Sequence, residues 1–598
     1  MDQASSTLNC LNCTIADNTS PINSAAIYVT AGTLAFTNCT FSKNTGTGGS
    51  SYGGAIYAKN ASLTCTGCTF SENSSVNNGG AVWVNAMSKA DFIDCDFISN
   101  VCTANLGGAI CLSGANPLNI TGGTFRANKA ANGGCFYNNA TSTINITGAK
   151  FTDNAATNGV GGVFYNNTSG HVINIKDSEF TGNTATKEGG AIFLKNGKWT
   201  VTNTAFKNNT AESNGGAIYA HTGSLTIQEG SYFEANETKA GSVGGGAVYV
   251  TTNATISVAG STFKANKANG SYKDTNNNTV HRKGGAIAIA SSAGAANVIN
   301  SSTFVSNESG WGGGVFVSGK QLDMSDCSFK MNTTSNRGGA VYGEGANLRL
   351  RIDKTHFSAN ASVQGAAVRI TNGVLYMNAS TVTDNKPSNN NTGGVLYLEK
   401  TSFINNCCFY DNDNSAAEWV SDIVLNGAAS TILNSTIVEK DSNVTGIRTY
   451  NTSESALTNL YNNTILCGHE NVGVGWGDNW ASVTSCGYNY TGPWVVKYTG
   501  TTTGAVAKTV QSDNVVTPVD VFDNFTSAST TDGRGYYTWT KPADVNGTSA
   551  ANVTAFLNGI TGGSDFATWL GTVDGLTKDI AGNSRPETGW YPGCYQGK

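Results

Sequence analysis

Two cysteine pairs are the most reactive pattern in this chain. Cys10-x-x-Cys13 and Cys65-x-x-Cys68 have the spacing of a zinc or redox site. None of the five histidines lies near either pair, which disfavours a metal site. We therefore predict no metal and no cofactor.

Carboxylates that could support catalysis are also poorly placed. Asp91, Asp94 and Asp96 alternate along one segment, so Asp94 lies on the opposite face from the other two. A glycoside hydrolase needs two carboxylates in one groove, and no other repeat supplies partners at matching positions. We predict no catalytic residue and favour a protein that is not an enzyme.

The composition favours short strands and many turns. The 598 residues include 73 glycines and 8 prolines, with 13% charged residues and a net charge of −5. This balance gives no sign of a nucleic-acid binder or coiled coil, and 9% aromatic residues argue against disorder. No apolar run is long enough for a transmembrane helix. No signal peptide is visible in Met1–Thr7, and we expect Met1 to fall inside a longer natural chain.

Two motifs alternate along most of the chain, at intervals of about 28 residues. The first is a Gly-Gly pair followed by Ala and apolar residues, with first positions at 53, 79, 107, 133, 161, 189, 215, 245, 284, 313 and 338, then as Gln364-Gly365-Ala366 and Gly393-Gly394-Val395. The second is Phe-x-x-Asn, starting at 41, 70, 97, 125, 151, 180, 206, 233, 263, 304, 329, 357 and 409, with Val382 in the same frame. The segments lack helical periodicity, so each repeat is predicted to form one turn of a parallel β-solenoid.

Stacking of successive turns assigns a place to each motif position. The fourth residue of the Gly-Gly motif is never polar and should face the core, as should the Phe of Phe-x-x-Asn; the fourth residues include Ile56, Phe316 and Ala367. The Asn is expected to form an internal ladder, and the glycine pair to allow a sharp corner. We predict an all-β fold with a solenoid over residues 1–470 and an irregular C-terminal cap over 471–598, which would cover the open edge of the last turn.

The repeat frame also explains six of the fifteen cysteines. Cys13, Cys39, Cys68, Cys95, Cys327 and Cys407 all lie two residues before the Phe position or its equivalent, where other repeats have Ser or Thr. A small residue is required there, so we interpret these cysteines as a structural stack. Cys467 with Cys486 is the best candidate for a separate disulfide.

The alternation of Gly-Gly-Ala-Ile with Phe-x-x-Asn resembles the repeats of the chlamydial polymorphic membrane proteins. That resemblance implies a right-handed parallel β-helix exposed at the cell surface as an adhesin. The tail, with Asp579-Ile-Ala-Gly-Asn-Ser-Arg-Pro586 and Tyr591-Pro-Gly-Cys-Tyr595, is similar to the ends of secreted bacterial right-handed β-helix proteins. Cys594 and Gln596 depart from that pattern.

Two features are candidate binding sites. The fifth residue of the Gly-Gly motif is mostly aromatic and should point outward. These side chains would form a stripe on which sugar rings stack. The stripe consists of Tyr57, Trp83, Tyr137, Tyr165, Phe193, Tyr219 and Tyr249. The alternative is that these rings stack on one another and only stabilise the solenoid. Residues 267–283 form an insertion that carries Lys273, Asp274, His281 and Arg282. This insertion is either a contact for a partner or a glycan, or a neutral surface loop.

Together these observations favour a secreted or cell-surface adhesin-like or structural protein that binds glycans or other surface partners. The first alternative is a polysaccharide lyase or glycoside hydrolase of the same fold. The second is an extracellular filament subunit that assembles end to end with copies of itself.

Overall fold

The structure is a computed structural model. It describes residues 6–585 except those numbered 87–88, 115–116, 140, 142, 240–243, 269–270, 274–276, 278, 291–296, 389–392, 413–419, 427–429, 440–443, 450–457, 462, 468–469, 475–482, 486–489, 492–513, 516–524, 530–534, 540–548, 561 and 581–582. The chain forms two compact units: an N-terminal unit of residues 1–297 and 307–310, and a C-terminal unit of residues 298–306 and 311–598.

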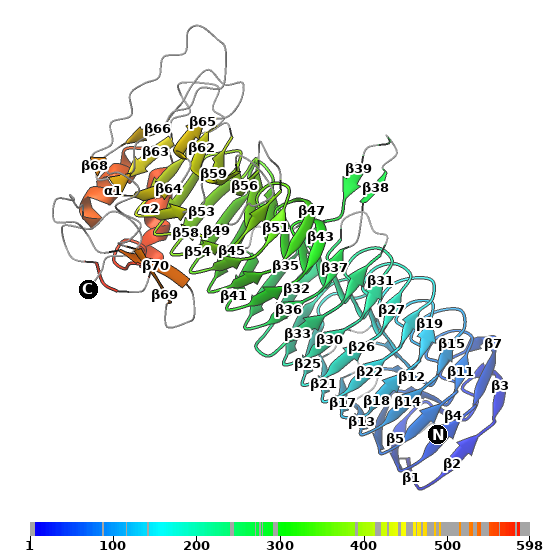
Figure 1. Ribbon diagram of the computed structural model, residues 1–598. Helices are drawn as coiled ribbons and strands as arrows, with labels where there is room; N and C mark the ends of the chain where they lie inside the picture. Colours follow the sequence, from blue (N-terminus) through cyan, green and yellow to red (C-terminus); the bar gives the residue numbers. More distant parts are fainter. Residues whose placement is uncertain are drawn as a thin grey trace. The chain divides into compact units, whose positions relative to one another are not determined.

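Each turn of the N-terminal unit contributes strands to three parallel sheets (Figure 1). In one turn the strands are β8 (Ile56–Lys59), β9 (Ala61–Thr66), β10 (Thr69–Ser71) and β11 (Ser74–Ser75). They pair in parallel with β12 (Val82–Asn85), β13 (Lys89–Ile93), β14 (Asp96–Ile98) and β15 (Val101–Cys102) of the next turn. The predicted parallel β-solenoid is therefore confirmed.

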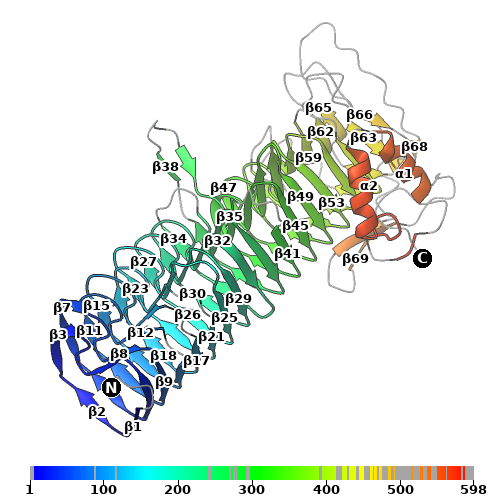
Figure 2. The same cartoon turned by 180° about the vertical axis from the view of Figure 1, so that it is seen from behind.

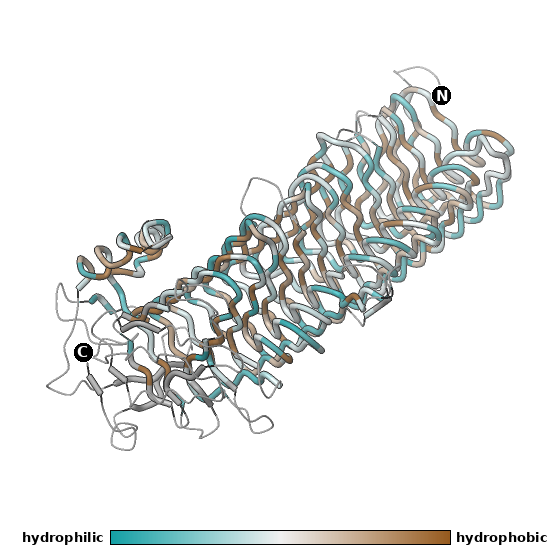
Figure 3. Tube along the Cα trace, turned by 90° about the horizontal axis from the view of Figure 1, so that it is seen from above, coloured by the Kyte–Doolittle hydropathy of each residue, from teal (hydrophilic) through white to brown (hydrophobic). Residues whose placement is uncertain are grey.

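Buried and more exposed residues alternate along these strands, and most of the buried ones are apolar. The Cα trace coloured by hydropathy shows apolar residues recurring from turn to turn (Figure 3). Ile56 and Val82 lie at the fourth motif position and are fully buried. Phe41, Phe70 and Phe97 stack in register, with adjacent ring centroids 4.7 and 4.5 Å apart and nearly parallel planes. Because each ring lies directly above its equivalent, one core position extends through many turns.

The predicted asparagine ladder is present inside the N-terminal unit. The side-chain amide of Asn73 donates to Asn100 Oδ1 at 3.0 Å and to the Phe41 carbonyl at 2.9 Å. The backbone N–H of Asn73 also donates to Asn100 Oδ1, at 3.1 Å. The same contacts recur along a series of fully buried residues: Asn44, Asn73, Asn100, Asn128, Asn154, Asn183, Asn209, Asn236, Asn266 and Asn307. The ladder therefore satisfies polar groups that would otherwise be buried without partners.

The glycine pair is required by both conformation and space. Gly53 has φ +62°, the left-handed region that glycine adopts at low cost. A Cβ on Gly54 would lie 2.5 Å from the carbonyl oxygens of Gly80 and Ser74. The predicted corner is therefore confirmed, because neither position accepts a larger side chain without displacing backbone.

In two repeats of the C-terminal unit, the motif frame predicted from the sequence is wrong by one residue. β44 (Val315–Ser318) pairs Val315 with Val341 of β48 (Val341–Glu344), so Val315 occupies the core position and Phe316 points outward. β52 (Val368–Thr371) likewise places Val368, not Ala367, opposite Val341. Three consecutive glycines at 312–314, and Ala366 in the place of the second glycine, made the frame ambiguous.

The segment predicted to be an irregular cap contains regular structure. It includes α1 (Ala550–Asn558), α2 (Gly563–Thr572) and an antiparallel hairpin of β69 (Phe525–Ser529) and β70 (Gly535–Trp539). Within this unit, the helices lie against the side of the solenoid (Figure 1, Figure 2). The reason is an apolar outer patch of the solenoid, Tyr376, Phe403 and Leu433, which packs against α1 and α2 through Val553, Leu557, Phe566, Trp569 and Leu570.

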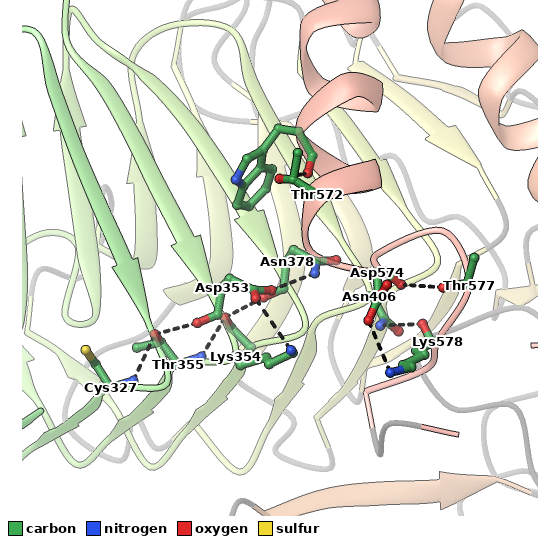
Figure 4. Close-up of polar contacts among 12 residues, drawn as sticks. Cys327, Asp353, Lys354, Thr355, Asn378, Asn406, Thr572, Asp574, Thr577 and Lys578 are labelled. Carbon is green, nitrogen blue, oxygen red and sulfur yellow. Dashed lines mark hydrogen bonds and ion pairs between the residues drawn. The ribbon is translucent and has the colours of Figure 1, made fainter. Parts of the chain in front are cut away.

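Hydrogen bonds fix the segment after α2 to the same side (Figure 4). Asn406 Nδ2 donates to the Lys578 carbonyl at 3.1 Å, and Arg585 Nη2 donates to Asn406 Oδ1 at 2.8 Å. Asn405 Nδ2 donates to the Gly575 carbonyl at 3.0 Å. Arg585 belongs to the Asp-x-x-Gly-Asn-x-Arg-Pro motif of the tail, so this motif has a structural role at the side of the solenoid.

Candidate functional site

The aromatic fifth positions of the N-terminal unit lie in register on the outside of one sheet. Tyr57 lies between Ile56 and Ala58, both fully buried, so its ring points outward. The strands that carry this stripe are β4 (Ile27–Val29), β8, β12, β16 (Ile110–Ser113), β20 (Phe136–Asn139), β24 (Phe164–Asn166), β28 (Ile192–Leu194), β32 (Ile218–Ile227) and β35 (Val248–Ala259). Their paired residues are Tyr28, Tyr57, Trp83, Cys111, Tyr137, Tyr165, Phe193, Tyr219 and Tyr249.

The rings of the stripe contact one another along the solenoid. Adjacent centroids are 4.8 Å apart for Tyr28 and Tyr57, and 4.3 Å apart for Tyr57 and Trp83. Phe193 and Tyr219 stack at 5.0 Å with planes 10° apart. This stacking is what the purely structural interpretation of the stripe predicted, and it also holds the rings in a fixed row.

The exposure of the rings differs along the stripe. Tyr57, Tyr165, Phe193 and Tyr219 are half-buried, whereas Trp83, Tyr137 and Tyr249 are only 8% exposed. Tyr28 is 46% exposed, and the sequence did not reveal it because Ser24 and Ala25 replace the glycine pair. The signal that could have revealed Tyr28 is the Ile27-Tyr28 pair, which lies one repeat before Ile56-Tyr57.

Cys111 divides the stripe into two aromatic rows. Its side chain is buried between Trp83 and Tyr137, and burial raises the pKa of its thiol well above the ordinary value. The second row is the longer one and consists of Tyr137, Tyr165, Phe193, Tyr219 and Tyr249.

Polar groups line one edge of the second row. Tyr165 Oη donates to Asn167 Oδ1 at 3.1 Å, and Asn167 Nδ2 donates to Tyr137 Oη at 3.3 Å. Lys195 Nζ donates to the same Asn167 oxygen at 2.6 Å, and the His221 ring stacks beside Tyr219. Burial raises the pKa of Tyr165, so its hydroxyl stays protonated and can donate. Sequence reasoning missed these groups, although each lies two residues after an aromatic and so on the same face of its strand.

A row of aromatic rings bordered by hydroxyl, amide and ammonium groups suits a sugar chain. The ring faces and edges offer apolar contact to sugar C–H groups, and the polar border offers hydrogen bonds to sugar hydroxyls.

Within the insertion at residues 267–283, a two-stranded hairpin projects from the N-terminal unit (Figure 1). β38 (Ser271–Lys273) pairs antiparallel with β39 (Thr279–His281). Arg282 is only 7% exposed, and His281 is half-buried, so neither has the free surface expected of a loop residue. The side chain of Lys273, and Asp274 as a whole, lie outside the described residues.

The described cysteines and Asp91 have surroundings that are typical of structural residues. Of the fifteen cysteines, the twelve with described side chains are all free, and Cys65 and Cys68 are buried in the core. The described part of the chain holds no cluster of three potential metal ligands. Asp91 pairs with Lys89 and accepts a hydrogen bond from Asn119. The predicted pair of Cys467 and Cys486 falls outside the described side chains.

These features define the class of the protein as a parallel β-solenoid built from glycine-corner and asparagine-ladder repeats. Four segments match the family model of the Chlamydia polymorphic membrane protein repeat, at residues 38–59, 67–85, 177–195 and 203–221. The resemblance inferred from the motifs is therefore confirmed at these repeats. A search of curated proteins finds no match to the chain. Among the described residues, no helix has the length and apolarity needed to cross a membrane.

Proposed function

We propose that this protein acts at the cell surface or outside the cell as an adhesin-like solenoid, with the second aromatic row binding glycans. The observation that carries the proposal is the combination of Tyr165, Phe193 and Tyr219 rings with the Asn167 hydrogen-bond network at their edge. The match to polymorphic membrane protein repeats supports a surface location.

Binding to a glycan array tests the proposal, with wild type compared with the double variant Tyr137→Ala, Tyr165→Ala. We expect wild type to capture a subset of glycans and the double variant to lose that signal. The matched control is Tyr232→Ala, because Tyr232 is a half-buried tyrosine of β33 (Tyr232–Glu234) on a different sheet. Equal capture by wild type and the double variant would refute a role for the row.

Incubation with acidic polysaccharides distinguishes the enzyme alternative from a binding protein. Release of unsaturated oligosaccharides would establish a lyase, and a binding protein is expected to release none.

A further inference from the structure

Ten asparagines in the chain are followed directly by glycine. Asparagine is a thermolabile residue, because the backbone nitrogen that follows it can attack the carbon of its side-chain amide. Glycine leaves this nitrogen most accessible, since it has no side chain. The structure describes both residues of seven such pairs, which begin at Asn78, Asn132, Asn158, Asn196, Asn214, Asn372 and Asn558. The reactivity of each pair therefore depends on where the fold holds the glycine N–H and the asparagine side chain.

In four of the seven pairs a backbone carbonyl accepts the glycine N–H, namely that of Gly79, Gly133, Gly215 and Gly559. At Gly215 the acceptor is the Gly244 carbonyl of the next turn, at 3.0 Å. The Asn214 side chain is held there as well, because its Oδ1 accepts the Gly244 N–H at 3.0 Å. A glycine nitrogen bound in this way can attack only after the turn opens locally.

At Asn196 the side chain is held against the following backbone nitrogen instead. Asn196 and Gly197 lie in the bend between β28 and β29 (Lys198–Thr202). The Gly197 N–H donates to Asn196 Oδ1 at 2.8 Å, a contact that no other of the seven described pairs makes. The amide carbon Cγ is one bond of about 1.2 Å from this oxygen, so the nitrogen and Cγ are at most about 4 Å apart. Reacting atoms in a near-attack arrangement lie about 3–3.5 Å apart, so a small rotation brings these two together.

The bend that carries Asn196 is fixed and also open to water. The Lys198 N–H donates to the His171 carbonyl at 3.1 Å, and the Ser224 N–H donates to the Gly197 carbonyl at 3.0 Å. These bonds to the two neighbouring turns keep the backbone of the bend in place. Asn196 and Gly197 line a surface groove and are only partly buried, so solvent reaches the side-chain amide.

We propose that Asn196 is a site of spontaneous deamidation in the folded protein. The Gly197 nitrogen loses its proton and bonds to Cγ of Asn196, and the side-chain nitrogen takes up a proton and leaves as ammonia. Water from the solvent then opens the cyclic imide at either carbonyl, which gives aspartate or isoaspartate. The product carries a carboxylate between the exposed Lys195 and Lys198. Because Lys195 borders the second aromatic row, the reaction changes the charge at that border.

Incubation of the folded protein in ¹⁸O-labelled water tests the proposal, because every carboxyl group that forms during the incubation carries the label. Digestion in ordinary water with a glutamate-specific protease then places Asn196 and Asn214 on separate peptides, residues 189–212 and 213–229. Mass spectrometry measures the labelled product in each peptide. We expect Asn196 to convert on the order of tenfold faster than Asn214, which must wait for local opening. Isoaspartate should be among the products, because it forms only through the imide.

Two controls separate the effect of the fold from that of the local sequence. In guanidinium chloride both asparagines are released, so their conversion rates should become similar. Asn196→Ser removes the reactive amide, so the label should disappear from residues 189–212 while the conversion of Asn214 stays unchanged.

Three results would overturn the proposal. The first is conversion of Asn196 no faster than that of Asn214 in the folded protein. The second is a rate difference that persists in guanidinium chloride, since the sequence and not the bend would then set the rate. The third is label that remains in the peptide of Asn196→Ser, since it would come from another residue.

Discussion

In the C-terminal unit, the internal asparagine ladder ends on a carboxylate, because Glu439 takes the place of the asparagine that would follow Asn412. The backbone N–H of Asn412 donates to both Glu439 oxygens at 3.2 Å, and its side-chain amide donates to Glu439 Oε1 at 3.1 Å. The same amide donates to Asp422 Oδ1 at 2.8 Å. Two fully buried carboxyl groups therefore share one amide.

This pair should make the C-terminal unit less stable as pH rises. Burial raises the pKa of Asp422 to about 8 and that of Glu439 well above its ordinary value. In the unfolded chain both carboxyl groups ionise near pH 4, whereas in the folded unit they keep their protons to higher pH. The stability that they contribute is therefore fully present below about pH 4 and is lost as the pH rises toward 8. We expect a loss of about 4 kcal/mol from Asp422 alone between pH 5 and pH 8, measured by urea unfolding.

The double variant Asp422→Asn, Glu439→Gln should flatten this pH dependence, since both amides are neutral and retain an acceptor oxygen. Asp565→Asn is the control, because Asp565 has an exposed side chain in the same unit. An unchanged slope in the double variant would contradict the assignment.

Removal of one member of the asparagine ladder should destabilise the turns around it. Asn154→Ala leaves the Phe125 carbonyl without its donor and the Asn128 amide without its acceptor. Because these groups are buried, we expect a cost of about 3 kcal/mol, seen as faster hydrogen exchange in the neighbouring strands. Asn174→Ala is the comparison, since Asn174 is a partly exposed member of an outer hydrogen-bonded row. Equal protection in the two variants would show that the inner ladder adds little.

The buried cysteines should resist alkylation while the protein is folded. Cys10 and Cys13 are partly exposed, whereas the other ten described cysteines are buried. Burial raises the pKa of Cys65 and Cys135, which further lowers their reactivity. With iodoacetamide at neutral pH, mass spectrometry should find modification at Cys10 and Cys13 first, and at the rest only after unfolding in urea. Labelling of Cys135 as fast as Cys10 in the folded protein would contradict the structural interpretation.

Loss of the Arg585 contact should loosen the segment after α2. Arg585→Ala removes the hydrogen bonds to Asn406 and to the Lys578 carbonyl. We expect trypsin to cleave after Lys578 several times faster than in wild type, because protease access follows local opening. Lys354→Ala is the control, since it removes only a long contact to Asp353, 3.9 Å between charged atoms. Identical cleavage of Arg585→Ala and wild type would show that the helices alone hold the segment.

The repeat pattern was enough to predict the core and the ladder. In a solenoid, each position lies above its equivalent in the previous turn, so a periodic sequence maps directly onto a stack of contacts. Phe70 over Phe41 and Asn73 beside Asn100 follow from that rule. The outward aromatic row follows from the same periodicity, combined with the alternation of strand side chains.

The tertiary structure alone decided the features that do not repeat. The contact between Asn406 and Arg585 joins residues 179 positions apart, and no periodicity encodes it. His171 lies against Gly197 of the next turn, a contact between two different residue types at equivalent positions that the repeat pattern does not encode. The sequence by itself therefore determined the solenoid and its internal stacks, whereas the position of the C-terminal helices and the polar border of the aromatic row required the packing of particular side chains across turns.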